Sequence, residues 1–474
     1  MKHNFKYLLY QLTIIVWLLN VHQIVLAQNL PKATGPNIVF ILVDDLGYSD
    51  PSFMGNTYYE TPNIDRLSKQ GMIFTNAYAN APNCAPTRAS LMSGWYAPRH
   101  GIYTVGNSDR GRSQDRKLIP IKNIEVLDSS VITLAEVLKS AGYTTAMFGK
   151  WHLGAGVGTR PQGQGFDVNV GGNEQGHPHS YFSPYHNPDI KDGPAGEYLT
   201  DRLTSEAITF LKEHKSNPFF LYLPYYAVHV PLQAKEHTVE KYKKKTSPYV
   251  RSNPVYGAML DNVDENIGKL LNTINELNLD KNTLIVFTSD NGGFYPVSSA
   301  GPLRGNKGML YEGGIRVPMI VKWPGKIKAG SVNNEPVISM DFFPTFLKVC
   351  GIQKPATKIL DGVDISPLLY GSGNIQRKAL YWHFPAYLEK APGMKETWRQ
   401  TPSSAIRKGD WKLIEYFEDG KLELFNLKND IGEQNEMSTK FPDKVKELKN
   451  DLIQWRKDFN APVPTQLNPE YVAK

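Results

Sequence analysis

The run Ile38-Val-Phe-Ile-Leu-Val-Asp-Asp45 decides the expected fold, because an unbroken apolar segment leads directly into two adjacent carboxylates. An apolar segment of this length is typical of a strand buried on both faces of a parallel sheet. In open sheets of that kind, binding sites gather just beyond the carboxyl ends of the strands. We therefore expect Asp44 and Asp45 to lie at a functional edge of the molecule.

Helix and strand patterns alternate after this segment. Thr61 and Pro62 are expected to cap a helix that Gly71 ends. Further helices are expected at 134–140, 201–213 and 256–277, and further strands at 143–148, 219–223, 283–288 and 317–321. This alternation predicts an α/β fold with a large, mostly parallel sheet and helices on both faces.

The pattern of residues changes after about residue 375. Strand patterns rich in aromatic and charged residues occur at 405–414 and 422–426, with a turn at Asp419-Gly420, and a terminal helix is expected at 443–459. A hairpin followed by a helix predicts a small antiparallel subdomain. The expected organisation is a leader over residues 1–27, a main domain over 28–374 and a C-terminal antiparallel subdomain over 375–474.

The leader has the pattern of a secretory signal peptide. Lys2 and Lys6 precede a mainly apolar stretch that ends at Ala27, a small residue before a polar segment. Polar residues such as Asn20 interrupt this stretch, whereas a membrane span needs about 20 predominantly apolar residues. We expect export to the periplasm or secretion, with no membrane span after signal removal.

Composition and charge narrow the classes of function. The 474 residues carry 53 Lys and Arg against 46 Asp and Glu, a formal net charge of +7. This small, dispersed excess argues against a nucleic-acid partner and suits either an anionic substrate or ordinary surface charge. Cys84 and Cys350 allow one disulfide, but their contexts differ. Cys350 ends an apolar helix pattern, whereas Cys84 lies among small and turn-forming residues.

A second acidic segment, Ser289-Asp-Asn-Gly292, follows another expected strand. Asp44, Asp45, Asp290 and the Asn291 amide form an all-oxygen donor set, which suits Ca²⁺ or Mg²⁺. Either cluster alone is explained as well by a turn or a helix cap, but two acidic strand ends together favour a metal that compensates the buried charges. Zinc is disfavoured because the histidines are not spaced as zinc ligands. An EF-hand calcium site at 261–265 is also excluded, because this acidic run lacks the spacing and the glycine of an EF-hand loop.

The segment Cys84-Ala-Pro-Thr-Arg88 predicts the start of a helix that Gly94 ends. Free backbone N–H groups at a helix N-terminus favour an anion, and Arg88, one turn further on, is placed to hold that anion or a nucleophile. A helix N-terminus also lowers the pKa of a thiol, so a plain reactive cysteine is an open alternative at this point.

The same segment resembles the C-x-P-x-R motif of the type I, formylglycine-dependent sulfatases, which have an alkaline-phosphatase-like fold. Gly149-Lys-Trp-His-Leu-Gly154 resembles the second motif of the family. The Ser289–Gly292 segment and Lys307 resemble its metal-binding and sulfate-binding segments, and residues 423–430 resemble its C-terminal subdomain. The resemblance implies that the chain is an enzyme that hydrolyses sulfate monoesters.

The resemblance further implies that a formylglycine-generating or sulfatase-maturing enzyme converts Cys84 to formylglycine. One hydroxyl of the hydrated aldehyde would attack sulfur, and the other would expel sulfate by regenerating the aldehyde. One Ca²⁺ would be held by Asp44, Asp45, Asp290 and Asn291, with the oxygen derived from Cys84 completing the set.

Five more residues receive roles from the family motifs. Lys150 and Lys307 would neutralise the charged oxygens of the transition state, and Arg88 would orient the nucleophile. His152, together with Lys307, would protonate the departing alcohol. His229 would take the proton that triggers regeneration of the aldehyde.

The substrate is less defined by the sequence. His177, His179 and His186 occupy a long polar loop, and His383 lies in an aromatic segment. Either segment is a candidate lining for a sugar subsite, and simple packing explains each equally well. We expect a sulfated saccharide rather than a small aryl sulfate. The alternatives are a phosphonate or phosphate monoester hydrolase of the same superfold, and a non-catalytic binder of sulfated glycans with an unmatured site.

Overall fold

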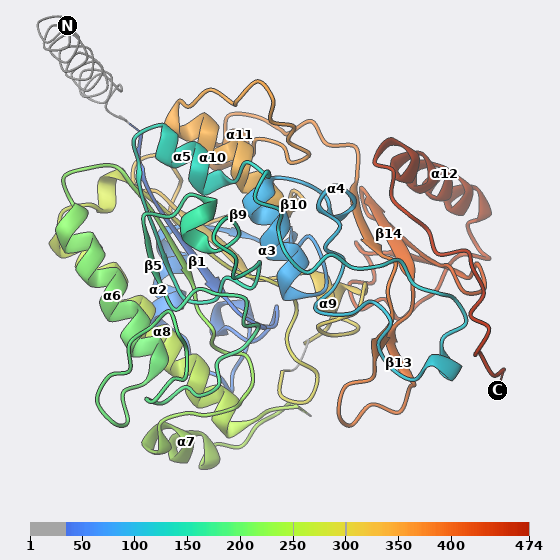
Figure 1. The fold of residues 1–474 in the computed structure, drawn as a ribbon, viewed down its shortest axis with the longest axis horizontal. Helices are drawn as coiled ribbons and strands as arrows, with labels where there is room; N and C mark the ends of the chain where they lie inside the picture. Colours follow the sequence, from blue (N-terminus) through green and yellow to red (C-terminus); the bar gives the residue numbers. More distant parts are fainter. Residues whose placement is uncertain (1–34, 250, 299–300, 474) are drawn as a thin grey trace, which may run out of the picture.

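The apolar run that opens the chain's sheet forms β1 (Asn37–Val43), which is buried along its whole length (Figure 1). The structure is a computed structural model that describes residues 35–249, 251–298 and 301–473. The expected leader, residues 1–27, lies outside the described residues. Among the described residues, no helix is both long enough and apolar enough to cross a membrane.

β1 lies inside an eight-stranded sheet. Its strand order is β5 (Val168–Val170), β4 (Thr144–Phe148), β6 (Phe219–Pro224), β1, β7 (Thr283–Ser289), β8 (Met319–Lys322), β2 (Met72–Phe74) and β9 (Ser331–Asn333). β8 runs antiparallel to both of its neighbours, and the other pairings are parallel. The expected mostly parallel sheet is therefore confirmed.

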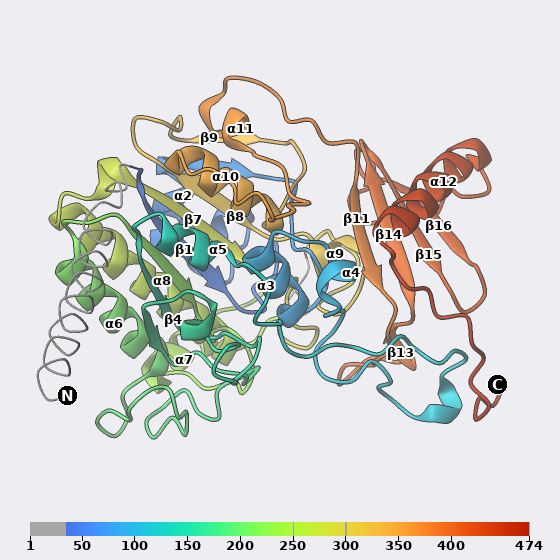
Figure 2. The ribbon, with the colours of Figure 1, turned by 45° about the horizontal axis from the view of Figure 1, so that its top comes forward.

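Alternate residues of β1 enter two separate hydrophobic cores, as the two-residue period of a strand requires. Val39 and Ile41 belong to the core under α2 (Pro62–Gln70), α6 (Leu199–His214), α7 (Glu236–Lys243) and α8 (Pro254–Glu276). Ile38 and Phe40 belong to the core under α3 (Cys84–Ser93), α5 (Leu134–Ser140), α10 (Phe342–Cys350) and α11 (Ser366–Tyr370). Helices thus cover both faces of the sheet (Figure 2).

The cap of α2 differs from the expectation. The side chain of Thr61 makes no capping hydrogen bond. The Asp264 carboxylate, on α8, accepts instead from the backbone N–H groups of Asn63 and Ile64, at 2.9 Å and 2.8 Å. The physical reason is that a buried carboxylate from a neighbouring helix satisfies the free N–H groups that a local cap would otherwise satisfy.

The C-terminal part forms a four-stranded antiparallel sheet beside the main body, with α12 (Pro442–Asp458) packed on it (Figure 2). Its strand order is β11 (Leu380–Phe384), β14 (Ser403–Lys408), β15 (Trp411–Tyr416) and β16 (Leu422–Asn426). The expected single strand at 405–414 is wrong, because Gly409 adopts a left-handed backbone and turns the chain between β14 and β15. The boundary at residues 374 and 375 stays a prediction.

Short elements complete the chain. They are β3 (Ala77–Tyr78) paired with β10 (Val337–Ile338), β12 (Leu388–Glu389) paired with β13 (Trp398–Gln400), and the helices α4 (Ala97–His100) and α9 (Glu312–Ile315). Short 3-10 helices occupy Ser52–Met54, Ser113–Asp115, Pro161–Gln164, Asp280–Asn282 and Ser339–Asp341.

Candidate active site

The acidic strand ends meet because β1 and β7 are parallel neighbours. Val43 pairs with Ser289 at the last position of both strands. The residues that follow are therefore adjacent: Asp44 and Asp45 after β1, and Asp290 and Asn291 after β7. The backbone N–H of Asp45 donates to Asp290 Oδ1 at 3.2 Å. All four side chains are buried.

These residues fit a hard divalent cation. Asp44 Oδ1 and Asn291 Oδ1 are buried oxygens that lack a hydrogen-bond partner in the described part of the chain. Asp44, Cys84 and Asp290 each present one ligand atom, and these atoms lie within 4.8 Å of one another. Burial, followed by repulsion from Asp290, raises the pKa of Asp44 to about 8. A cation relieves both effects, and carboxylate and amide oxygens are the donors that Ca²⁺ prefers.

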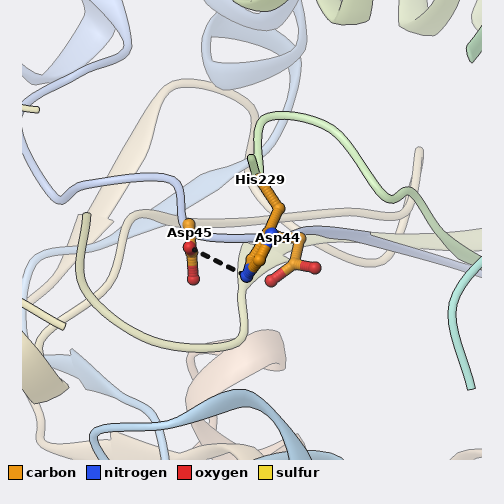
Figure 3. Close-up of side chains that lie close together, drawn as sticks. All are labelled: Asp44, Asp45 and His229. Atoms are coloured by element: carbon orange, nitrogen blue, oxygen red, sulfur yellow. Dashed lines mark ion pairs between the residues drawn. The ribbon is translucent and has the colours of Figure 1, made fainter. Parts of the chain in front are cut away.

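Asp45 connects the acidic cluster to two basic side chains. Its oxygens accept from Lys307 Nζ at 2.7 Å and 2.8 Å, and His229 Nε2 lies 3.6 Å from Oδ2 (Figure 3). Burial opposes ionisation of Asp45, yet the charge of Lys307 lowers its pKa below the usual range. Asp45 also has φ 60, a left-handed backbone that is strained for a residue with a side chain.

Arg88 and Lys150 contact the carboxylates of Asp290 and Asp44 and stabilise their charges. Arg88 donates to Asp290 Oδ2 through Nε at 2.9 Å and Nη2 at 2.7 Å, and to the Lys150 carbonyl through Nη1 at 2.7 Å. Lys150 Nζ lies 2.6 Å from Asp44 Oδ2. These contacts are fully buried, so the pairs act in a low dielectric and fix the carboxylates strongly in place.

Cys84 is the first residue of α3, as expected, and Gly94 ends the helix in a left-handed conformation. Its thiol is free, and so is that of Cys350, so the two do not form a disulfide. Burial raises the pKa of the Cys84 thiol, although Lys150 and Lys307 favour the thiolate. Desolvation therefore outweighs the attraction of the two lysines, which argues against a reactive thiolate at this position.

Two histidines flank the cluster. His152 Nδ1 lies 3.5 Å from Cys84 Sγ. Its backbone is left-handed at φ 64, and Gly176 lies so close that an added Cβ would be 2.6 Å from the ring. His229 Nδ1 donates to the Val230 carbonyl at 2.8 Å, because a carbonyl only accepts. The neutral His229 ring therefore carries its lone pair on Nε2, the atom that faces Asp45.

A pocket of about 230 Å³ opens above these residues. Six predicted side chains line it: Asp45, Cys84, His152, His177, His229 and Lys307. The other expected residues lie beneath it, fully buried: Asp44, Arg88, Lys150, Asp290 and Asn291. Arg110 and Arg399 also line the pocket. Neither belongs to a recognisable motif, and no local pattern in the sequence indicates them.

The three histidines that were expected to bind substrate lie in different surroundings. The His177 ring stacks parallel to His229, with centroids 6.2 Å apart. His179 contacts Gln175 on the surface and does not line the pocket. The structure contradicts the placement of His383, which is buried in the C-terminal subdomain. Its ring nitrogens contact Ser404 Oγ at 2.7 Å and the Pro462 carbonyl at 2.9 Å, so neither is free to bind a sugar.

Comparisons with known proteins agree with this geometry. A sequence model described as Sulfatase matches residues 36–352, and one described as N-sulphoglucosamine sulphohydrolase, C-terminal, matches residues 305–458. The chain is 33% identical to a sulfatase from Formosa agariphila, over 90% of each chain. It is 34% identical to N-acetylgalactosamine-6-sulfatase from Rattus norvegicus, over 73% of this chain and 68% of that protein.

A solved structure shows the same fold. Ps i-CgsB, in complex with k-i-k-neocarrahexaose, superposes with a TM-score of 0.75 at 30% identity, covering 92% of this chain and 95% of that one. The match to the Sulfatase sequence model extends over the acidic strand ends and the Cys84 helix. The chain therefore belongs to the sulfatase family, with its alkaline-phosphatase-like fold, and is a sulfuric ester hydrolase.

Proposed function

We propose that the protein hydrolyses a sulfate monoester on a saccharide, using a formylglycine made from Cys84 and one Ca²⁺. The observation that carries this proposal is the position of Cys84. It lines the pocket and presents its side-chain atom within 4.8 Å of the oxygens of Asp44 and Asp290. A hard cation prefers oxygen ligands to a thiol, so an oxygen at position 84 would join the carboxylates as a ligand.

A saccharide substrate is supported by two relatives. The rat relative is an N-acetylgalactosamine-6-sulfatase, and the structure of Ps i-CgsB contains k-i-k-neocarrahexaose. We also propose that the chain is exported, as its leader indicates. The maturing enzyme that oxidises Cys84 is then a necessary partner before the protein becomes active.

In the proposed reaction, formylglycine and Ca²⁺ act together with side chains of the protein. Hydrated formylglycine supplies an oxygen nucleophile, and Ca²⁺ supplies positive charge at the reacting oxygens. Arg88 holds Asp290 with two N–H groups and thereby orients the acidic side of the site. Lys307, which lines the pocket, is placed to neutralise sulfate oxygens as their charge grows in the transition state.

The distances favour an exchange of the two histidine roles assigned from the sequence. His152 was expected to protonate the departing alcohol, but its Nδ1 is the ring nitrogen in contact with Cys84 Sγ. We assign to His152 the removal of a proton from the group at position 84. His229 and Lys307 both lie beside Asp45 and face the pocket. Lys307 is therefore the proposed source of the proton for the alcohol, and His229 shares this role once its Nε2 has bound a proton.

The test combines mass spectrometry with sulfate release. An active preparation should carry an aldehyde in place of the thiol at residue 84, and Cys84→Ala should abolish sulfate release without unfolding the protein. Cys350→Ala is the matched control, because Cys350 ends α10 outside the pocket, and it should keep full activity. An active enzyme with an unmodified Cys84 thiol would overturn the proposal.

A further inference from the structure

Building on the proposed function, we infer that Arg399 binds a second anionic group of the substrate, so that the enzyme selects oligosaccharides with more than one sulfate or carboxylate. Arg399 belongs to β13, far in sequence from every motif of the site. It nevertheless lines the same pocket as Cys84 and Lys307. The C-terminal part of the chain thereby contributes directly to the substrate pocket.

Arg399 is held beside Lys307 by close packing. Its side chain lies against Gly308, where an added Cβ would be 2.5 Å from Arg399 Cδ. Gly308 also has φ +92, so both its space and its backbone favour glycine. Arg399 Nη1 donates weakly to the Lys307 carbonyl at 3.4 Å. These contacts place a guanidinium directly beside the lysine that faces the sulfate.

Arg399 makes no ion pair with a carboxylate in the described part of the chain, although the charges of Glu389 and Asp45 attract it. Its Nε is buried and has no hydrogen-bond partner within the described residues. Glu389, the acid that attracts Arg399 most strongly, forms its ion pair with Arg110 Nη2 at 2.8 Å instead. A buried donor without a partner is costly, and a bound anion removes that cost. Arginine suits this task because its planar fork matches the oxygens of sulfate and carboxylate.

The pocket is so small that the further sugar units of an oligosaccharide would lie outside it. At about 230 Å³ it is smaller than the roughly 300–1,000 Å³ that drug-sized ligands occupy. A neighbouring hollow of about 460 Å³ shares Arg399 in its lining. Arg399 therefore stands where a chain of sugars would pass from the reacting unit to the next one.

The neighbouring hollow is itself basic and aromatic. Arg304 lies 3.9 Å from the centre of the Tyr311 ring, and Arg251 lies 4.8 Å from that of Tyr295. Neither arginine has a carboxylate ion-pair partner among the described residues, and Glu396 is the acid in the lining. Two guanidinium groups over aromatic faces suit a polyanionic sugar chain better than a neutral one.

The experiment compares rates on matched substrates. The probes are 4-nitrophenyl sulfate and pairs of carrageenan and glycosaminoglycan oligosaccharides that differ only in carrying one or several anionic groups. We expect the wild-type enzyme to prefer the multiply charged member of the pair it cleaves. In Arg399→Met, the ratio of kcat/KM for that member to kcat/KM for the aryl ester should fall roughly ten- to a hundredfold, mainly through KM.

Two further variants separate recognition from packing. Arg399→Lys keeps the charge but not the fork, so it should recover part of the lost selectivity. Arg66→Met removes an exposed arginine on α2 and should leave the ratio unchanged. Cys84→Ala gives a readout without turnover, because oligosaccharide binding to it by calorimetry should weaken when Arg399→Met is added.

The outcomes distinguish this inference from the proposed function. Absence of sulfate release from every probe counts against the proposed function. Release from the aryl ester without any preference for multiply charged saccharides, or an unchanged ratio in Arg399→Met, overturns the inference while leaving the sulfatase activity intact.

Discussion

Removal of a single lysine tests how the C-terminal subdomain supports the active site. Lys412 Nζ, on β15, lies 3.0 Å from Glu312 Oε1 and 2.9 Å from Glu433 Oε1, and all three side chains are fully buried. Glu312 begins α9, shortly after the loop that carries Lys307. Lys412→Met keeps the bulk of the side chain but leaves the buried Glu433 carboxylate without its cation, and Glu312 with Arg316 alone at 3.2 Å.

The expected loss of stability is large. Breaking a buried ion pair by removing one partner costs about 3–5 kcal/mol, because an uncompensated charge stays behind. Here Glu433 loses its cation while Glu312 keeps Arg316, so we expect a loss within that range. The loss should also move the Lys307 loop and lower kcat.

The loss should depend on pH. Burial raises the pKa of Glu433 to about 7, although Lys412 opposes this shift. A carboxyl with a raised folded-state pKa stabilises the fold fully below its unfolded value, near 4.5, and this contribution is lost as pH rises through 7. Without Lys412 the ionised form becomes still less favourable. Lys412→Met should therefore be more destabilising at pH 8 than at pH 5.

Urea unfolding followed by circular dichroism at both pH values measures these losses. Lys408→Met is the matched control, because Lys408 pairs with Glu447 and Asp451 but is 37% exposed. An exposed pair contributes less than about 1 kcal/mol, so this variant should stay near wild-type stability. A loss in Lys412→Met as small as in the control, or an equal loss at pH 5 and pH 8, would refute the reasoning.

Other perturbations address the site itself. Chelation with EGTA should suppress sulfate release and lower the melting temperature, and Ca²⁺ should restore both better than Zn²⁺; preferential rescue by zinc would contradict the oxygen-ligand argument. Arg88→Lys loses the two-pronged contact with Asp290, which should lower kcat/KM roughly ten- to a hundredfold in steady-state assays, and wild-type kinetics would disprove the orienting role. Gly176→Ala should displace the His152 ring and lower kcat at least about tenfold. Gly373→Ala is the control, because its added Cβ makes only ordinary contacts, and it should leave kcat unchanged. Equal values of kcat in the two variants would show that the position of the His152 ring is unimportant.

Local patterns predicted most of the architecture. The apolar run before Asp44 is a central strand, and the helix at Cys84 begins and ends as expected. Such features depend on neighbouring residues, so the sequence displays them directly. Errors arose where a distant group replaced a local one, as when Asp264 capped α2, or where a tight turn divided a strand pattern, as at Gly409.

The order of residues along the chain was sufficient to single out Cys84, the acidic strand ends and the family, because these belong to short motifs at the ends of predictable elements. Tertiary structure alone decided that His383 packs in the C-terminal subdomain and that Arg399 enters the pocket. It also decided which histidine contacts Cys84. These outcomes depend on how separate segments pack in space, and sequence periodicity carries no information about such long-range contacts.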